Sequence, residues 1–417
     1  MPSQQPEHQR SRSTTRRIIV LGCTGSIGTS TLEVLAHLRS TGHAFDIIGL
    51  ACGSNVDKAL EQAQQCHAGA LAVTHAESDA IKHATSKGSS NTPRIFTGPN
   101  AVIEMLEMVA QPGDLVVAAI VGAAGLAPVV RAIELGCDIA LANKETLVAG
   151  GDIVLPLVER KGVHLLPVDS EHSAVFQCMM AKRGPSEVER VVLTASGGPF
   201  RQWPLERIQN ATVAEALNHP TWTMGRKVTV DSATLMNKAL EIIEARWLFD
   251  LPAAKISAVI HPQSIVHSFV EFIDGSVMAQ LNPPDMKGPI HYALTWPERA
   301  SSCAPKLDWS RLSQLTFEPV DHDRFGAVNL GLQVAAAGGS TGAVFNAANE
   351  VAVNAFLAGD IPFGRITSLV AQVLDEHDRF DILTLDDVFS ADHIGRVRAT
   401  EALHAPRAQL RSASVRG

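Results

Sequence analysis

Short runs of consecutive apolar residues alternate with amphipathic stretches over the first 170 positions. Five runs predict buried strands: RIIVL (17–21), FDIIGLA (45–51), DLVVAAIVG (114–122), DIALA (138–142) and VHLLPV (163–168). Helical periodicity separates them, for example from Leu126 onward. Continuous apolar strands alternating with helices are typical of a doubly wound parallel sheet. The N-terminal part is therefore predicted to be a Rossmann-like α/β domain.

The pattern changes in the second half of the chain. The strand ERVVLTA (189–195) precedes the alternating stretches VHSFVEF and SVMAQL, which predict a hairpin turning at Asp274-Gly275. From Asn329 onward the periodicity is helical, which predicts a small helical bundle. The expected division is a disordered tail (1–15), a nucleotide-binding domain (16–165), a central α+β domain (166–300), a linker arm (301–328) and a C-terminal helical domain (329–405).

Composition excludes several classes of function. The chain is 46% hydrophobic and 19% charged with a net charge of -8, which disfavours nucleic-acid binding. Six cysteines without CxxC spacing indicate reduced thiols rather than disulfides or a zinc site. The most apolar run, 115–130, is short and interrupted by glycine and proline, so no membrane span is predicted. Residues 1–17 lack the apolar core of a secretion signal; we expect a bacterial cytoplasmic protein, with a transit peptide as the alternative.

Glycines follow the first predicted strand at a GxxGxxG spacing. Gly22, Gly25 and Gly28 lie between RIIVL and a predicted helix. Such a turn leaves backbone N–H groups and a helix N-terminus free for a pyrophosphate. The alternative is an ordinary glycine-rich turn.

The end of the second strand indicates which cofactor binds. An NAD enzyme usually has an acidic residue there, which binds the ribose 2′-hydroxyl. This chain has Cys52-Gly53-Ser54-Asn55, with Lys58 one helical turn later. Without an acid to repel a 2′-phosphate, and with Ser54, Asn55 and Lys58 available to bind one, the sequence favours NADP.

Polar side chains follow two later strands. Asn143, Lys144 and Glu145 come after DIALA, at the edge where parallel sheets bind ligands. Asp169 and Glu171 come after VHLLPV, and in an extended chain they point the same way. The repulsion between two adjacent carboxylates is reduced either by exposure to solvent or by a bound metal ion. A site with only oxygen ligands favours Mg²⁺ or Mn²⁺. Further on, the turn Ser196-Gly197-Gly198 either binds a phosphate or simply enters a loop.

The stretch 219–249 combines a loop and a helix. The loop holds His219, Trp222, Met224 and Gly225, and the helix is expected to start near Asp231 or Ser232. One helix face carries Thr234, Asn237, Lys238 and Glu241, and the other carries Met236, Leu240, Ile243 and Trp247. The polar face suits an anion and a metal, or else is solvated with internal ion pairs. His261 and His267, further on, are predicted to be structural.

Seven motifs appear in order: GCTGSIG, ALANKETLVAGG, PVDSEHSA, SGGPF, HPTWTMGRKVTVDSATLMNK, PDMKGPI and FNAANEVAV. Together they resemble the 1-deoxy-D-xylulose 5-phosphate reductoisomerase family of the non-mevalonate isoprenoid pathway. The resemblance covers nearly the whole chain after the tail. It departs at Ser54, where the family often has a basic residue.

The resemblance implies roles for particular positions. NADPH would contact Thr24, Gly25, Ser26, Ile27, Gly53, Ser54, Asn55, Asn143, Glu145, Gly225 and also Met224. Mg²⁺ or Mn²⁺, with Co²⁺ as a further option, would bind Asp169, Glu171 and Glu241. The sugar-phosphate substrate would contact Lys144, Ser170, Glu171, Ser196, His219, Trp222, Ser232, Asn237, Lys238 and Glu241. Of all these, Lys144, Asp169, Glu171, His219 and Glu241 would be catalytic, and residues 196–226 would form a flap.

The resemblance also implies a reaction and an assembly. The reaction is a metal-assisted retro-aldol and aldol rearrangement followed by hydride transfer from NADPH, giving 2-C-methyl-D-erythritol 4-phosphate; the assembly is a homodimer. One alternative is an aspartate-semialdehyde-type dehydrogenase, which needs a nucleophilic cysteine such as Cys178. Another is a non-catalytic NADP-binding sensor, which would have no use for Asp169, Glu171 and Glu241.

Overall fold

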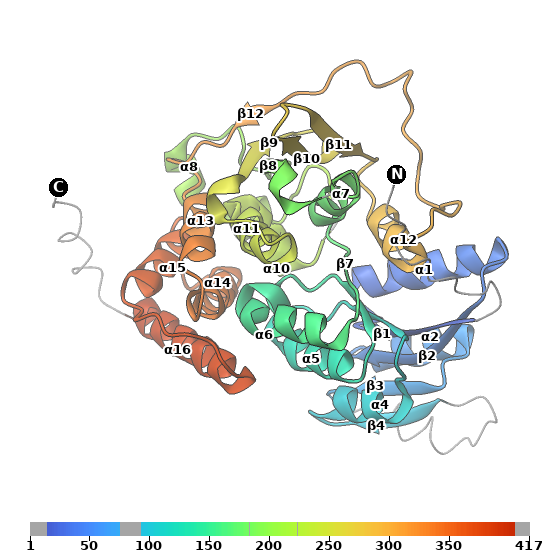
Figure 1. Cartoon of the computed structure of the whole chain (residues 1–417). Coiled ribbons are helices and arrows are strands. Elements are labelled where there is room, and N and C mark those ends of the chain that lie inside the picture. The colour runs from blue at the N-terminus through green and yellow to red at the C-terminus, as the bar shows by residue number, and fades with distance from the viewer. Residues whose placement is uncertain (1–14, 76–92, 183, 223, 405–417) are drawn as a thin grey trace.

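A computed structural model describes residues 15–75, 93–182, 184–222 and 224–404 (Figure 1). Apart from Thr15, the predicted tail lies outside these residues. Within them, no helix is long and apolar enough to cross a membrane.

The N-terminal part is a parallel sheet, as the apolar runs predicted. In the described residues its strand order is β4-β3-β2-β1-β5-β6-β7. The strands are β1 (Arg16–Leu21), β2 (Phe45–Cys52), β3 (Ala70–Val73), β4 (Arg94–Thr97), β5 (Leu115–Ala118), β6 (Asp138–Leu141) and β7 (Leu165–Pro167). Every adjacent pair is parallel. The chain winds outward from β1 in one direction and then from β5 in the other, so the order reverses between these two neighbours. Ligands bind at such a switch point, beyond the carboxyl ends of the strands.

Helices cover both faces of this sheet (Figure 1). They are α1 (Ser26–Ser40), α2 (Val56–Cys66), α4 (Ala101–Val109), α5 (Leu126–Glu134), α6 (Glu145–Lys161) and, from later in the chain, α12 (Lys287–Thr295), with the 3₁₀ turn η1 (Ala123–Gly125) before α5. The central strands are buried on both sides, Ile18 and Ile19 being fully inaccessible, which explains their uninterrupted apolar sequence.

A second, mixed sheet follows in the order β11-β10-β8-β9-β12. Its strands are β8 (Val188–Ala195), β9 (Ile256–Ile260), β10 (Val266–Phe272), β11 (Val277–Leu281) and β12 (Glu318–Pro319), with η2 (Pro185–Glu187) and η3 (Ala253–Lys255) at its margin. The predicted hairpin is confirmed, since β10 and β11 are antiparallel neighbours. The predicted linker arm 301–328 needs a correction: Glu318 and Pro319 pair with β9, and the next helix begins before residue 328.

Five helices lie between the two sheets or beside the second one: α7 (Ser170–Met179), α8 (Leu205–Gln209), α9 (Val213–Ala216), α10 (Arg226–Thr234) and α11 (Met236–Leu248). The C-terminal part consists of α13 (Ala327–Ala337), α14 (Thr341–Ala358), α15 (Arg365–Asp375) and α16 (Leu385–His404). In Figure 1 these red and orange helices pack against α6 and α11, which confirms the predicted helical bundle.

The helix predicted to start near Asp231 starts earlier and is broken. Gly225 is extended and precedes α10, while Leu235 has a φ of 59° and separates α10 from α11. The hydroxyl of Thr234 donates to the carbonyl oxygens of Val230 and Asp231, which closes the last turn of α10. Thr234 therefore does not share a helix face with the polar residues of α11, and Ser232 is not a helix cap.

The prediction of an extended Asp169–Glu171 segment is also wrong. The strand ends at Pro167, and Ser170 already begins α7, with Asp169 at the N-cap position. Carboxylates in the first turn of a helix are stabilised by its N–H groups and dipole. The helix start, not strand alternation, therefore presents Asp169 and Glu171 together.

Candidate active site

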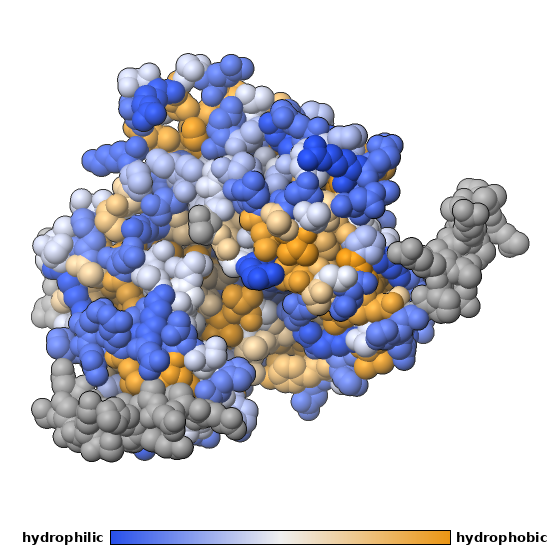
Figure 2. Space-filling model, turned by 180° about the vertical axis from the view of Figure 1, so that it is seen from behind, coloured by the Kyte–Doolittle hydropathy of each residue, from blue (hydrophilic) through white to orange (hydrophobic). Residues whose placement is uncertain are grey.

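One cavity collects most of the predicted residues. Its volume is about 760 Å³, within the range of small-molecule sites. The face seen in Figure 2 is largely hydrophilic, with apolar patches beside a hollow near its middle. The predicted residues that line the cavity are Gly25, Ser26, Ile27, Asn143, Lys144, Glu145, Asp169, Ser170, Glu171, Ser196, Trp222, Met224, Gly225, Ser232, Asn237, Lys238 and Glu241. They lie in loops that follow strands of both sheets and in the helices α1, α6, α7, α10 and α11.

Three carboxylates converge at one end of the cavity. Asp169, Glu171 and Glu241 each place one oxygen within 4.8 Å of the others. Glu241 comes from α11, far along the chain, and is only 1% exposed. Two like charges 4 Å apart repel by about 1 kcal/mol in water and by about 4 kcal/mol at an effective dielectric of 20. The predicted alternative of a solvated helix face is thus excluded, and the cluster needs cations.

Two lysines supply positive charge to this cluster. The ammonium group of Lys144 contacts Asp169 and lies 3.2 Å from Glu241. The ammonium group of Lys238 lies 3.0 Å from Glu171 and also contacts Glu241. Burial disfavours a charged lysine, yet these carboxylates raise the pKa of both ammonium groups. Asn237 donates a further hydrogen bond to Glu241.

The carboxylates themselves are unequal. Burial, followed by repulsion from Glu241, raises the pKa of Glu171 to about 7. Burial also opposes the charge on Asp169, but Lys144 holds the pKa of that carboxyl below its ordinary value. A divalent cation would offset the repulsion that raises the pKa of Glu171, and three carboxylates are the hard oxygen donors that Mg²⁺ prefers. The donor set therefore fits such an ion.

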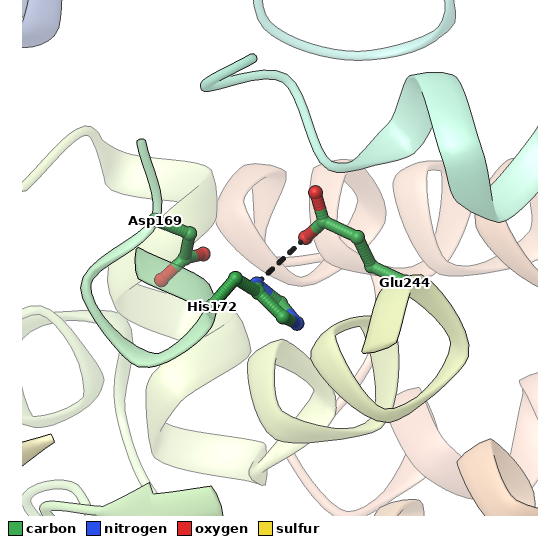
Figure 3. Close-up of side chains that lie close together, drawn as sticks. All are labelled: Asp169, His172 and Glu244. Atoms are coloured by element: carbon green, nitrogen blue, oxygen red, sulfur yellow. Dashed lines mark ion pairs between the residues drawn. The ribbon is translucent and has the colours of Figure 1, made fainter. Parts of the chain in front are cut away.

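A buried ion pair between His172 and Glu244 lies next to the three carboxylates. His172 of α7 lies between Asp169 and Glu244 of α11 (Figure 3). Its Nδ1 is 3.1 Å from a carboxylate oxygen of Glu244, without the alignment of a hydrogen bond. Burial would lower the pKa of His172, but Glu244 raises it to about 9. Asp169, His172 and Glu244 also lie close enough to hold a metal, but a protonated imidazole is not a ligand.

A second polar group surrounds His219. Its Nδ1 accepts hydrogen bonds from the backbone N–H groups of Thr221 and Trp222. In the neutral ring the proton is consequently on Nε2, which lies 3.1 Å from the hydroxyls of both Ser196 and Ser232. Burial lowers the pKa of His219 and so favours this neutral form. Although His219 does not line the cavity itself, it orients two hydroxyl groups that do.

The glycine turn has the geometry of a dinucleotide site. Gly22 has a φ of +85°, and a Cβ there would lie 2.4 Å from the carbonyl oxygen of Ala119. A Cβ on Gly28 would lie 2.3 Å from the oxygen of Gly22, so only glycine lets α1 start this close to β1. The first turn of α1 has no side-chain cap and no acidic residue. Its N–H groups remain available for a pyrophosphate, so this part of the cavity fits NADPH.

Four predicted cofactor residues lie outside the cavity lining: Thr24, Gly53, Ser54 and Asn55. The last three are exposed and follow β2, the neighbour of β1. Lys58 bonds to the carbonyl oxygen of Thr24 and to the hydroxyl of Thr29, both at 3.0 Å. Its ammonium group therefore stabilises the glycine turn, and binding of a 2′-phosphate by Ser54, Asn55 and Lys58 stays a prediction.

The side chain of Asn143 is fully engaged within the protein. Its amide nitrogen donates to the carbonyl oxygen of Gly122 at 2.9 Å, and its oxygen accepts from the backbone N–H of Thr146 at 2.8 Å. Its side chain therefore fixes the loop after β5 in place. Three further residues that line the cavity were not predicted as site residues from the sequence: Lys227, Ser264 and His267. Lys227 was detectable as the partner of Asp231 at i,i+4, had α10 been predicted to begin at Arg226.

Three family models match almost all of the chain outside its ends. Residues 18–151 match the model "1-deoxy-D-xylulose 5-phosphate reductoisomerase", and residues 165–249 match its C-terminal domain. Residues 281–398 match "DXP reductoisomerase C-terminal domain". The chain belongs to the 1-deoxy-D-xylulose 5-phosphate reductoisomerase family.

Individual members of the family align over nearly their whole length. The protein of that name from Geobacter metallireducens is 50% identical over 93% of this chain and 99% of its own. The one from Pelodictyon phaeoclathratiforme is 50% identical over 92% and 98%.

Solved structures of the family agree with this fold. The Zymomonas mobilis reductoisomerase in complex with NADPH has a TM-score of 0.85 at 38% identity, covering 94% of this chain and 100% of its own. A DOX-P reductoisomerase in complex with NADPH, fosmidomycin and magnesium has a TM-score of 0.84 at 40% identity, covering 93% and 98%.

Membership of the family decides against the dehydrogenase alternative, and the structure explains why it fails. Cys178 is buried in α7, and burial raises the pKa of its thiol to about 11, so it is not a thiolate nucleophile. A non-catalytic NADP-binding sensor would not need Asp169, Glu171 and Glu241, so this alternative does not explain the buried carboxylate cluster.

Proposed function

We propose that the protein catalyses the NADPH-dependent conversion of 1-deoxy-D-xylulose 5-phosphate to 2-C-methyl-D-erythritol 4-phosphate. One observation carries this proposal: a single cavity contains both the glycine turn of a dinucleotide site and three converging carboxylates. The nucleotide and the metal are thereby brought to one substrate. A solved DOX-P reductoisomerase, 40% identical to this chain, is in complex with both NADPH and magnesium.

The site residues divide by position. Asp169, Glu171 and Glu241 would hold Mg²⁺ or Mn²⁺, with Co²⁺ as a further option. When bound, the metal supplies a Lewis acid for the oxygens of the hydroxyketone during the carbon–carbon rearrangement. Lys144 lies beside this cluster and would orient the substrate oxygens through its ammonium group. Ser170 opens α7, its hydroxyl donates to the carboxylate of Glu171, and it would contact the substrate beside the metal.

The substrate phosphate would bind at the other polar group. Ser196 and Ser232 present hydroxyls held by His219. Asn237 and Lys238, whose side chains contact the carboxylate cluster, would reach the phosphate from the start of α11. These contacts orient the sugar chain, and their binding energy can be used at the reacting carbons. NADPH, when bound across the glycine turn, supplies the hydride for the final reduction. Thr24 to Ile27, Gly53 to Asn55, Asn143, Glu145 and Gly225 remain the proposed cofactor residues.

The segment 196–226 is proposed to act as a flap. Its base is anchored, because Phe200 is fully buried and packs against Trp203 and, edge to face, against Phe363 of the C-terminal part. Its other end carries Trp222 and Met224, which are partly exposed and line the cavity. Closure of this end over the substrate would exclude water from the reacting carbons.

The assembly is proposed to be a homodimer in the bacterial cytoplasm. The edge strand β11 exposes Val277 and Met278, and Ile273 beside it is 64% exposed. An apolar sheet edge of this kind is a template for pairing with a second copy. We also propose that the chain divides into domains at the boundaries expected from the sequence, except that the linker arm contributes β12 to the second sheet and ends before Ala327, with the metal-binding residues in the central domain.

The decisive experiment follows NADPH oxidation, by the loss of NADPH absorbance, in the presence of 1-deoxy-D-xylulose 5-phosphate. We expect turnover with Mg²⁺, loss of turnover with EDTA and its recovery when excess Mg²⁺ is added. Absence of turnover in the presence of Mg²⁺, NADPH and substrate would contradict the proposed function. NADPH binding without turnover would instead support the sensor alternative.

A further inference from the structure

Glu145 is connected to the C-terminal helices by a chain of buried polar contacts. Its carboxylate lies 3.1 Å from the ammonium group of Lys227 on α10. The same ammonium group lies 3.0 Å from Asp231, one turn along α10. Asp231 in turn accepts a hydrogen bond of 2.9 Å from the side-chain amide of Asn349 on α14. Asp231 is 1% exposed and Asn349 is inaccessible, so these contacts form inside the protein.

The carboxylate at the cavity end of this chain is held by both of its oxygens. Lys227 contacts one oxygen, and the amide of Asn143 donates to the other at 3.2 Å. Glu145 opens α6 and lines the cavity together with Ile120 and Val121, which follow β5 beside the glycine turn. An ionised carboxylate on the wall of a nucleotide site can accept hydrogen bonds from ribose hydroxyl groups. Glu145 is therefore placed to contact the sugar of a dinucleotide.

Contact with Lys227 favours the ionised form of Glu145, which is the form that can accept hydrogen bonds from ribose hydroxyl groups. Glu145 is 6% exposed, and burial on its own would raise the pKa of its carboxyl. The charge and hydrogen bond of Lys227, together with a backbone hydrogen bond and the charge of Lys144, outweigh burial and lower that pKa below its ordinary value. An apolar residue at position 227 would remove the cation that contacts this buried carboxylate, and a buried carboxylate that loses its counter-charge tends to protonate or to turn away.

Asp231 and Asn349 fix Lys227 in turn. A lysine side chain has many rotamers, and contact with two carboxylates at once restricts them. The amide of Asn349 holds Asp231 from the opposite side, where α14 packs against α10 and α6. A residue of the C-terminal helices that does not line the cavity thus bears on the shape of the nucleotide site.

We propose that Lys227 is a positioning residue for the nicotinamide cofactor, which holds Glu145 against the ribose and is itself held by Asp231 and Asn349. This inference rests on the proposed function, because it requires that the cavity binds NADPH.

The test is the dissociation constant of NADPH, measured by its fluorescence on the unaltered protein and on Lys227→Met. We expect NADPH to bind about tenfold more weakly to Lys227→Met, equal to about 1.4 kcal/mol. The KM for the sugar phosphate should change by much less than this tenfold step, within about twofold. Lys227→Arg should recover most of the affinity. Lys255→Met is the matched control, since Lys255 binds the carbonyl oxygen of Val188 and does not line the cavity.

The pathway through Glu145 has its own test. In a Glu145→Gln background, Lys227→Met should weaken NADPH binding much less than it does alone, because the two residues act as one unit. Full additivity would contradict positioning through Glu145. Asn349→Leu should weaken NADPH binding in the same direction, and a variant that only melts earlier would contradict the link to α14.

The outcomes separate the two proposals. If Lys227→Met is folded, as judged by thermal unfolding, and binds NADPH as tightly as the unaltered chain, the positioning role is refuted while the proposed function stands. If the unaltered chain does not bind NADPH, the proposed function is refuted, and the positioning role with it.

Discussion

The imidazole Nε2 of His172 lies 2.9 Å from the backbone carbonyl oxygen of Glu241, and both groups are buried. This contact joins the first turn of α7, which carries Asp169 and Glu171, to the turn of α11 that carries Glu241. The three carboxylates thereby keep a fixed separation. On its other side, the ring contacts Glu244 (Figure 3).

Replacing one member of the His172–Glu244 pair should lower the free energy of unfolding more than replacing both. His172→Leu leaves Glu244 buried without an opposite charge, so we expect the free energy of unfolding to fall by about 3 to 5 kcal/mol. The double variant His172→Leu/Glu244→Leu should recover a substantial part of that loss. Urea unfolding at pH 7 measures both. A double variant as unstable as the sum of the two single variants would contradict an ion pair.

Glu241→Gln should weaken metal binding and lower turnover together. The substitution preserves the shape of the side chain but removes one of three negative charges at the cluster. Loss of a residue that only contacts a metal ligand lowers metal affinity by about 10- to 100-fold. Because Glu241 is itself a proposed ligand, we expect Glu241→Gln to bind Mg²⁺ about a hundredfold more weakly. Titration of activity with Mg²⁺ gives the constant. Glu61→Gln, an exposed change on α2, serves as the control, and unchanged Mg²⁺ dependence in Glu241→Gln would refute the ligand assignment.

Lys238→Met should mainly raise the KM for the sugar phosphate. A hydrogen bond to a charged group is worth about 1.5 to 3 kcal/mol, so about a tenfold or greater increase in KM is expected. The dissociation constant of NADPH should not change. Steady-state kinetics and NADPH fluorescence separate the two effects, with the exposed Lys306→Met as the control. Unchanged affinity for the phosphate-bearing substrate would show that the phosphate binds elsewhere.

Acid should destabilise the protein through His267. This buried ring contacts the carbonyl oxygen of Asn282, with Lys238, Asp169 and His261 as its charged or titratable neighbours. Burial lowers the pKa of His267 from 6.5 to about 4. Because the folded pKa is below the unfolded one, its contribution is complete above pH 6.5 and is lost as the pH falls toward 4.

Between pH 7 and pH 5 that loss is about 2 kcal/mol in the free energy of unfolding. The variant His267→Gln, whose amide can donate to the same carbonyl oxygen, should lose correspondingly less over this range. His322→Gln, an exposed change, should behave like the unaltered chain. Urea unfolding at the two pH values makes the comparison. Equal losses in all three proteins would mean that other groups cause the acid sensitivity.

Ser54→Asp should shift cofactor preference from NADPH toward NADH. Ser54 is exposed at the end of β2, beside the glycine turn, where an acid would repel the 2′-phosphate and bind the 2′-hydroxyl. The ratio of kcat/KM for the two cofactors measures the change, and we expect it to move by about tenfold or more toward NADH. Ser313→Asp provides the exposed control. An unchanged ratio would refute the role assigned to this strand end.

The sequence by itself determined the parallel sheet, the hairpin and the C-terminal helices, and it supplied the candidate site residues. Uninterrupted apolar runs predicted the parallel sheet, because strands that are buried on both faces carry apolar side chains at successive positions. The glycine turn was recognisable since its spacing follows from local backbone geometry, as Gly22 and Gly28 demonstrate. The motifs also identified the carboxylates, the lysines and the family, because each lies within a short segment.

Tertiary structure alone decided how these segments meet. The break at Leu235, the start of α7 at Ser170 and the engagement of Lys58 with Thr24 depend on contacts that no local pattern encodes. Glu241 joins Asp169 and Glu171 only because α11 packs beside α7, and Asn349 reaches Asp231 only because α14 packs on α10. Local periodicity reports which residues are apolar or polar, whereas the identity of a buried charge's partner is fixed by the packing of elements far apart in the chain.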